Sequence, residues 1–172
     1  NQEAILTTWE DFARSIWPVE LTDPANDPAT LRDHAAEILQ ASIQDMASPQ
    51  TAQQQADKSQ GRGAASDSST HVDRASDRHG LTRLAAGMEL TGLISEYRAL
   101  RASVIRLWRE SEPEPDLNDL DDLTRFNECI DQSLAEAVRA YTEQVQRDRE
   151  ALLASEQAAR RDADGRGPGP GG

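Results

Sequence analysis

Cysteine, aromatic residues and positive charge are all scarce in this sequence of 172 residues. The single cysteine, Cys129, excludes an internal disulfide and a zinc site built from cysteines. Aromatic residues make up 4% of the chain, so a core has to be built mainly from Leu, Ile, Val and Ala. Pro, Gly and strand-forming residues are rare within the apolar segments, which favours helices.

Long apolar runs are missing as well. No stretch approaches the roughly 20 apolar residues that span a bilayer, and the N-terminal residues lack the basic start and apolar centre of a signal peptide. We therefore expect a cytoplasmic location, although a chain that starts at Asn1 rather than Met leaves its natural beginning open.

Basic residues are outnumbered by acidic ones, 18 to 31, which gives a formal net charge of -13. Such a surface repels a phosphate backbone and anionic lipids. We therefore expect partners that are neither nucleic acid nor membrane.

Apolar residues recur at spacings of three and four, which predicts an all-α fold arranged as an antiparallel helical bundle with a long C-terminal signalling helix. Pro18, Pro49 and the pair Pro113 and Pro115 mark helix ends, because proline cannot continue a helix. The predicted organisation is a helical pair over 1–48, a flexible linker over 49–71 that can hold a short helical turn near 51–58, a long helical hairpin over 72–146 that completes the same domain, a connector helix over 147–164 and a disordered tail over 165–172.

The hairpin consists of two predicted helices of unequal length. The first is expected from Val72 or Asp77 to Trp108 or Arg109, with a heptad seam in its later half formed by Leu90, Leu93, Tyr97, Leu100, Val104 and Leu107. Three glycines in it, Gly80, Gly87 and Gly92, either permit a kink or a close helix contact or are simply tolerated.

The second is expected from residues 117–119 to about 161, so it overruns its partner. We predict that the overrun pairs with the same segment of a second subunit; the alternative is a frayed, exposed helix.

Charged residues flank the apolar seams of this hairpin. Antiparallel packing would bring Arg98 or Arg101 near Glu128 or Asp131. We interpret the set either as a polar switch or ligand pocket between helices, or as ordinary surface and interfacial salt bridges that fix register. The members of this candidate interhelical polar network are Glu96, Arg98, Arg101, Arg125, Glu128 and Asp131.

Signatures of metal, cofactor or catalytic chemistry are not found. His34, His71 and His79 do not form a pair at metal-binding spacing, although His34 or His79 could in principle hold haem as a lone helix ligand instead of having a structural role. The acidic stretch 116–122 lacks the glycine and ligand order of a calcium loop. With no phosphate-binding loop or nucleophile elbow, we expect no catalytic, cofactor-binding or metal-binding residues.

Several strings in the two hairpin helices nevertheless resemble a known family. They are His79-Gly80, Arg83-Leu84-Ala85-Ala86-Gly87-Met88, Glu96-Tyr97-Arg98-Ala99-Leu100-Arg101, Leu107-Trp108, Asp122-Leu123-Thr124-Arg125-Phe126-Asn127-Glu128 and Ile130-Asp131-Gln132-Ser133-Leu134-Ala135-Glu136. Together they are similar to the N-terminal domain of RsbT co-antagonist (RsbRD-type) proteins, which is also found at the N-terminus of bacterial sensor histidine kinases. The resemblance extends over about 5–150, and the string from Glu96 to Arg101 is its most specific part.

The resemblance implies a bacterial signalling input domain, a globin-like fold without haem, and a homodimer. In kinase members the phosphoacceptor and ATP-binding domains follow, and we expect such a core downstream of this chain, which itself would not be an enzyme. The leading hypothesis is therefore an input domain that relays a signal through a dimeric C-terminal helix to a kinase or other output module. The alternatives are a stand-alone stress-regulator scaffold or partner-switching protein, and a haem or small-ligand sensor. The sequence does not reveal the stimulus, the output protein, whether the tail is native or whether a ligand pocket exists.

Overall fold

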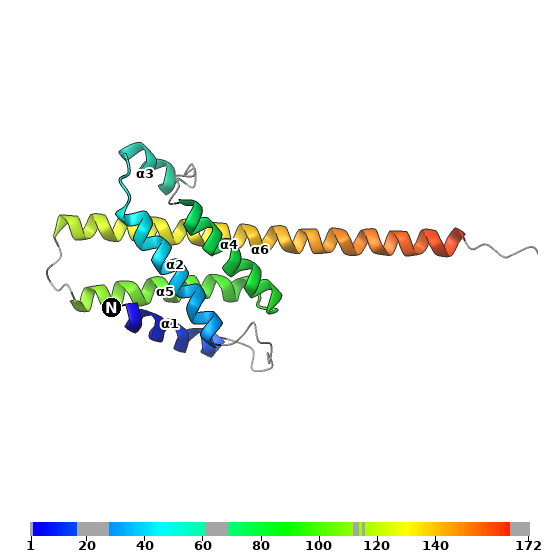
Figure 1. Ribbon diagram of the computed structural model, residues 1–172, viewed down its shortest axis with the longest axis horizontal. Helices are drawn as coiled ribbons and strands as arrows, with labels where there is room; N and C mark the ends of the chain where they lie inside the picture. The colour runs from blue at the N-terminus through cyan, green and yellow to red at the C-terminus, as the bar shows by residue number, and fades with distance from the viewer. Residues whose placement is uncertain (1, 17–27, 61–68, 112–113, 115, 166–172) are drawn as a thin grey trace, which may run out of the picture. The chain divides into compact units, whose positions relative to one another are not determined.

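The computed structural model describes residues 2–16, 28–60, 69–111, 114 and 116–165. These residues form six helices and no strand, which confirms the predicted all-α class (Figure 1). The helices are α1 (Gln2–Ile16), α2 (Pro28–Ala47), α3 (Ala52–Ser59), α4 (Ser69–Ala85), α5 (Leu90–Ser111) and α6 (Leu117–Gly165).

The chain divides into two compact units, Asn1–Tyr141 and Thr142–Gly172. This division lies between Tyr141 and Thr142, whereas the sequence predicted the end of the bundle at residue 146. Helix α6 has 49 residues and crosses the boundary without interruption.

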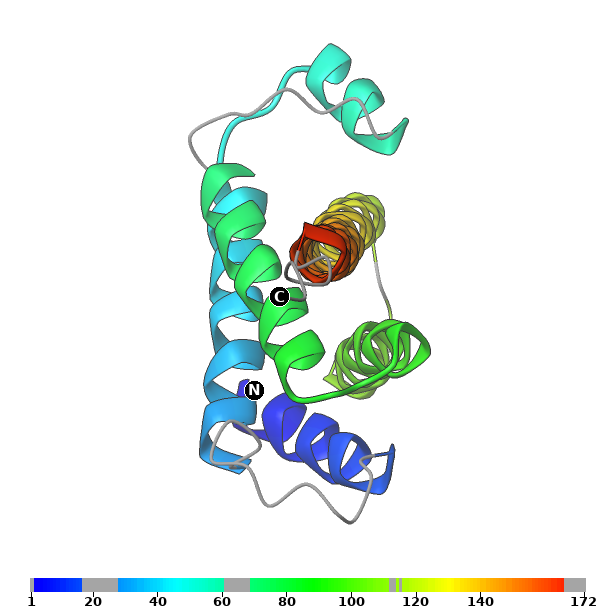
Figure 2. The same cartoon turned by 90° about the vertical axis from the view of Figure 1, so that its right-hand side faces the viewer.

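The first unit is held together by packing of α1 against α5 and α2, and of α4 against α2 and α5. Within it α5 and α6 run in opposite directions, while α2 and α4 lie together and cross them (Figures 1 and 2). The predicted seam of α5 is confirmed, since Leu93, Tyr97 and Leu100 are all buried. The main core cluster contains Leu6, Trp9, Ala13, Ala35, Ile38, Leu39, Leu93, Tyr97, Leu100, Phe126, Ile130 and Ala137.

The single helix predicted over the first arm of the hairpin is wrong, because the chain turns between α4 and α5. Gly87 adopts a φ of 74°, the left-handed conformation that glycine reaches without a steric penalty. The amide of Met88 donates to the carbonyl of Arg83 at 3.0 Å, and the amide of Gly87 donates to Leu84 at 2.9 Å. This pair of bonds is a Schellman motif, which ends a helix by satisfying its last carbonyls. Gly87 is therefore a helix terminator and not a tolerated interruption.

Gly80 has a different role, at a close approach of two helices. A Cβ atom built on Gly80 of α4 would lie 2.3 Å from the carbonyl oxygen of Ala137 on α6. No side chain fits at that distance, so the sequence needs glycine there for α4 to reach α6. Of the roles expected for the three glycines, the close helix contact thus applies to Gly80.

The predicted linker contains one short helix. Thr51 caps α3: its hydroxyl accepts from the amide of Gln54, whose side chain accepts in return from the amide of Thr51. This capping box confirms the helical turn expected near 51–58. The rest of the linker over 61–68 and the tail over 166–172 lie outside the described residues.

The second unit contains the C-terminal part of α6, which confirms the predicted helix over 147–164. From Thr142 to Arg161 every side chain except that of Gln144 is exposed. Arg147 forms an ion pair with Glu143 at 3.6 Å, one turn away. Among all the described helices, none combines the length and the apolar character that a membrane crossing needs.

Candidate functional site

An opening with a mostly apolar wall lies where four helices of the first unit meet. It has a volume of about 270 Å³, and α1, α2, α5 and α6 all contribute to its wall. Its lining residues are Gln2, Ile5, Leu39, Ser42, Ile43, Met46, Val104, Trp108, Asp122, Leu123 and Phe126. We call this space the apolar pocket.

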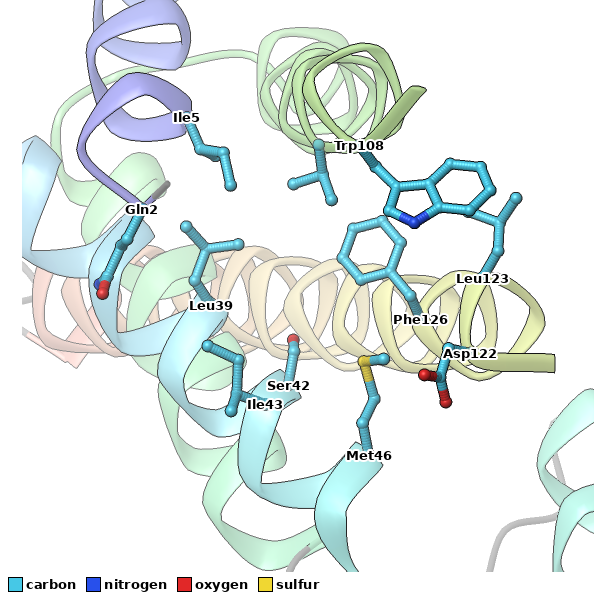
Figure 3. Close-up of a pocket in the computed structure, with 11 residues that line it drawn as sticks. Gln2, Ile5, Leu39, Ser42, Ile43, Met46, Trp108, Asp122, Leu123 and Phe126 are labelled. Atoms are coloured by element: carbon cyan, nitrogen blue, oxygen red, sulfur yellow. The ribbon is translucent and has the colours of Figure 1, made fainter. Parts of the chain in front are cut away.

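The wall of the apolar pocket is hydrocarbon, aromatic and thioether, with polar groups at its edges. Figure 3 shows Leu39, Trp108 and Phe126 around a common space, and Gln2 and Asp122 at opposite edges of it. Ile43, which is 52% exposed, lies at the opening to solvent. The pocket can therefore exclude water from an apolar group while leaving a polar group of the same molecule near the surface.

A second feature is a buried charge cluster between α4 and α5. The Nε of Arg83 donates to both carboxylate oxygens of Glu96, at 2.8 and 3.1 Å, and Nε2 of His79 lies 2.9 Å from Oε2. All three side chains are almost completely buried. Trp9 of α1 adds a bond from its indole nitrogen to the backbone carbonyl of Glu96 at 3.2 Å. The cluster therefore links three helices of the first unit.

The charges in this cluster follow from burial and from the partners. Burial lowers the pKa of His79, which more than offsets the opposite effect of Glu96. Burial alone would raise the pKa of Glu96, but the hydrogen bond from His79 and the charge of Arg83 outweigh it, so that the pKa is lowered. We therefore assign a neutral His79 that donates through Nε2 to an ionised Glu96, with Arg83 as its counter-charge.

Aromatic rings surround the imidazole of His79. The ring of Tyr97 lies edge-on at a centroid distance of 5.5 Å, and that of His34 at 6.1 Å. Burial raises the pKa of the Tyr97 phenol and lowers the pKa of His34. The two histidines, 45 positions apart in the chain, thus meet in the fold. Among the described residues no three His, Cys, Asp or Glu side chains are placed to hold a metal ion.

The predicted polar network is only partly assembled. Arg101 and Asp131 form the expected ion pair between α5 and α6, so the predicted antiparallel register is confirmed at this point. Glu96 does not join them: it is directed into the buried cluster. Its position on the buried side of α5 gives it Arg83 of α4 as its counter-charge.

The remaining members lie at other places. Arg98 is exposed and lines a cleft between α1 and α5. Arg125 donates to the backbone carbonyl of Ser48 at 2.8 Å and so holds the end of α2. Glu128 lines a polar pocket together with Arg125. The structure thus pairs Arg101 with Asp131 and Glu96 with Arg83, and it places Arg125 and Glu128 around a common pocket.

A further buried ion pair was not predicted. Lys58 of α3 pairs with Asp45 near the end of α2, and Gln50 donates to the same carboxylate at 3.4 Å. Both charged side chains are almost completely buried. The pair attaches α3 to the bundle, although α3 belongs to the segment that was expected to be a flexible linker. The composition of that segment gives no sign that Lys58 has a buried partner.

Cys129 is fully buried on α6. Burial raises the pKa of its thiol to about 11, with a smaller opposite effect from Ser42. A thiol in this state is almost entirely protonated near neutral pH and is a poor nucleophile.

The chain matches no protein-family model, no curated protein and no solved structure in the comparisons made with each. The similarity to the RsbRD-type domain therefore remains an expectation from the quoted strings.

Proposed function

We propose that this chain is the sensory or regulatory input domain of a bacterial signal-transduction protein, in particular of a sensor histidine kinase. In this proposal α6 pairs with α6 of a second copy and passes a change in the first unit to an output module. The resemblance to the RsbRD-type domain supports the class of protein, and the continuity of α6 supports the route.

The single observation that carries the proposal is the composition of α6 across the unit boundary. The helix contributes Phe126, Ile130 and Ala137 to the core of the first unit. It then continues unbroken through residues with exposed side chains, including Val145, Leu152 and Leu153, which are 43%, 62% and 47% exposed. An unpaired helix in water gains only a few tenths of a kcal/mol from each ion pair on its surface. A partner helix over these apolar side chains would supply the missing stabilisation.

The spacing of these side chains favours a helix of the same kind as the partner. Val145, Leu152 and Ala159 follow one another at intervals of seven residues, so they lie on one face of α6. An identical helix beside it presents the same stripe, which satisfies the symmetry of a two-fold dimer. Because a packed helix moves as a stiff element, a shift imposed on its first half is carried into its second half.

Cysteine cross-linking tests the pairing. Leu152→Cys places a thiol on the apolar stripe, while Ala154→Cys places one two residues on, about 200° around the helix. Mild oxidation is expected to give a disulfide-linked dimer for Leu152→Cys and much less for Ala154→Cys. The native Cys129 is buried and serves as a silent background. Equal yields at the two positions, or a monomer by light scattering at micromolar concentration, would contradict the pairing.

A chimaera tests the relay itself. The chain is joined through α6 to the dimerisation and catalytic core of a well-behaved histidine kinase, and autophosphorylation is measured for insertions of different length after Glu150. An insertion of seven residues keeps the helical phase and is expected to preserve activity, whereas one of four residues rotates the output and is expected to change it. Activity that is independent of the phase would refute the relay and favour a stand-alone interaction protein.

A further inference from the structure

We infer that the apolar pocket binds a small hydrophobic amine: a molecule with an apolar body of about ten non-hydrogen atoms and one protonated nitrogen, held at Asp122. The binding itself is independent of the proposed relay. Its consequence, that the ligand acts as an input to α6, rests on the proposed function.

The volume sets the size of the ligand. A cavity of about 150 Å³ lined by aliphatic and aromatic side chains accommodates benzene, with its six carbon atoms. The apolar pocket, at about 270 Å³, is less than twice as large. By proportion it holds about eleven non-hydrogen atoms. A space of this size fits a phenylalkyl or short alkyl compound and is small for haem or a nucleotide.

The wall sets the polarity of the ligand body. Leu39 and Phe126 are buried, and Ile5, Val104 and Trp108 are partly buried around the same space. A charged or strongly polar body would lose its hydration here without gaining hydrogen bonds. The aromatic faces of Trp108 and Phe126 suit a ring or a methylene chain.

The polar groups at the edge of the pocket determine which charge on a ligand is favoured. The one ionisable side chain among the lining residues is Asp122, an exposed carboxylate in the early part of α6 (Figure 3). A carboxylate at the rim attracts a cation and repels an anion. The net charge of -13 acts in the same direction at longer range. Size, wall and charge together specify a hydrophobic amine and disfavour a fatty acid of the same length.

The position of the pocket connects it to the proposed relay. Three of its lining residues, Asp122, Leu123 and Phe126, belong to α6, and the others belong to α1, α2 and α5. A ligand between them therefore contacts both the beginning of the relay helix and the helices against which it packs. Such a ligand favours one position of α6 over another only if it binds more tightly when the helix is in that position.

The test compares three probes with one apolar body: phenylbutylamine, phenylbutanol and phenylbutyrate. Each is titrated into the full chain at low salt, with tryptophan fluorescence and calorimetry as readouts. Trp108 lines the pocket and is expected to report binding, whereas Trp9 is buried in the core. We expect the amine to bind about three-fold more tightly than the alcohol, and the carboxylate to bind most weakly.

Matched variants test whether Asp122 is the residue that favours the amine. Asp122→Asn is expected to remove the preference for the amine, whereas Asp121→Asn, which changes the net charge equally but lies outside the pocket lining, is expected to retain it. Val104→Phe fills the space and is expected to weaken all three probes at least ten-fold. Should that variant fail to fold, the two aspartate variants still decide the question, because both side chains are exposed and their loss costs little stability.

The inference would be overturned if no probe bound, if all three probes bound with equal affinity, or if Asp121→Asn lost the preference for the amine. It would also be overturned if Trp108 emission changed with protein concentration alone, because the pocket would then be covered by a second copy of the chain. The relay is tested separately through the rate of Leu152→Cys cross-linking. Binding without an effect on cross-linking would confirm the site and refute its role as an input, so the two failures are distinguishable.

Discussion

The buried charge cluster gives the most demanding prediction about the fold. Glu96→Gln removes the carboxylate that accepts from Arg83 at 2.8 and 3.1 Å and lies 2.9 Å from Nε2 of His79. The guanidinium of Arg83 then stays buried without this counter-charge. Breaking a buried ion pair on one side typically costs about 3–5 kcal/mol. A natural domain has about 5–15 kcal/mol of stability in total, so the substitution should remove a large part of it.

The assay is urea denaturation followed by far-UV circular dichroism and by tryptophan fluorescence. A loss of about 3–5 kcal/mol corresponds to a melting temperature lower by about 10 °C or more. The variant Arg83→Met should be destabilised by a similar amount, because it leaves Glu96 buried. The double variant Arg83→Met, Glu96→Gln removes both charges, and we expect it to be clearly more stable than the sum of the single effects predicts. Asp131→Asn, which breaks the more exposed pair with Arg101, is the control and should cost less than about 1 kcal/mol.

The cluster would not act as an electrostatic unit if Glu96→Gln changed the free energy of unfolding by less than about 1 kcal/mol. The same conclusion would follow if the double variant lost the full sum of the single effects. Either result would mean that water or another group reaches Arg83 when the carboxylate is removed.

The remaining predictions concern single residues. Gly80→Ala should destabilise the fold by about 1–3 kcal/mol through the clash with the backbone of Ala137. Gly92→Ala should cost less, because the neighbouring Met88 side chain can move. Equal melting temperatures for the two variants would contradict the close contact at Gly80. Because burial holds the pKa of His79 below the 6.5 of an unfolded chain, acid protonates the unfolded state first. The free energy of unfolding should therefore fall below about pH 6.5, by up to about 1.4 kcal/mol per pH unit, and His79→Gln should reduce this slope in urea titrations. Cys129 should react with a thiol reagent at pH 8 only as fast as the chain opens, so addition of urea should accelerate labelling sharply, and rapid labelling of the native chain would refute its burial.

Periodicity allowed the helices and their buried faces to be predicted. The apolar stripe of α5 is read from local spacing alone, since every third or fourth side chain of a helix faces the same way. The register of α5 against α6 followed from antiparallel packing, and the pair of Arg101 with Asp131 agrees with it. The short turn near 51–58 was predicted without its start, although Thr51 followed three residues later by Gln54 is the pattern of a capping box.

The buried charge cluster could not be predicted, because its residues meet only after the chain turns at Gly87. In the continuous helix that the sequence predicted, Arg83 and Glu96 would be about 20 Å apart and on opposite sides. The sequence Ala86-Gly87-Met88 could have signalled a helix end, since glycine is common after a C-terminus, but the two other glycines nearby gave the same signal without ending a helix. The apolar pocket depends on side chains from four helices, so it has no local signature at all.

The turn between α4 and α5 is also tied to α6. The hydroxyl of Tyr141, the last residue of the first unit, donates to the backbone carbonyl of Met88 at 2.8 Å, one residue after Gly87. The turn between α4 and α5 therefore supports two features, the pairing of Arg83 with Glu96 and a hydrogen bond that joins the turn to α6. A substitution at Gly87 that unwinds this turn would therefore weaken the attachment of the bundle to α6 at Tyr141, where the exposed part of the helix begins.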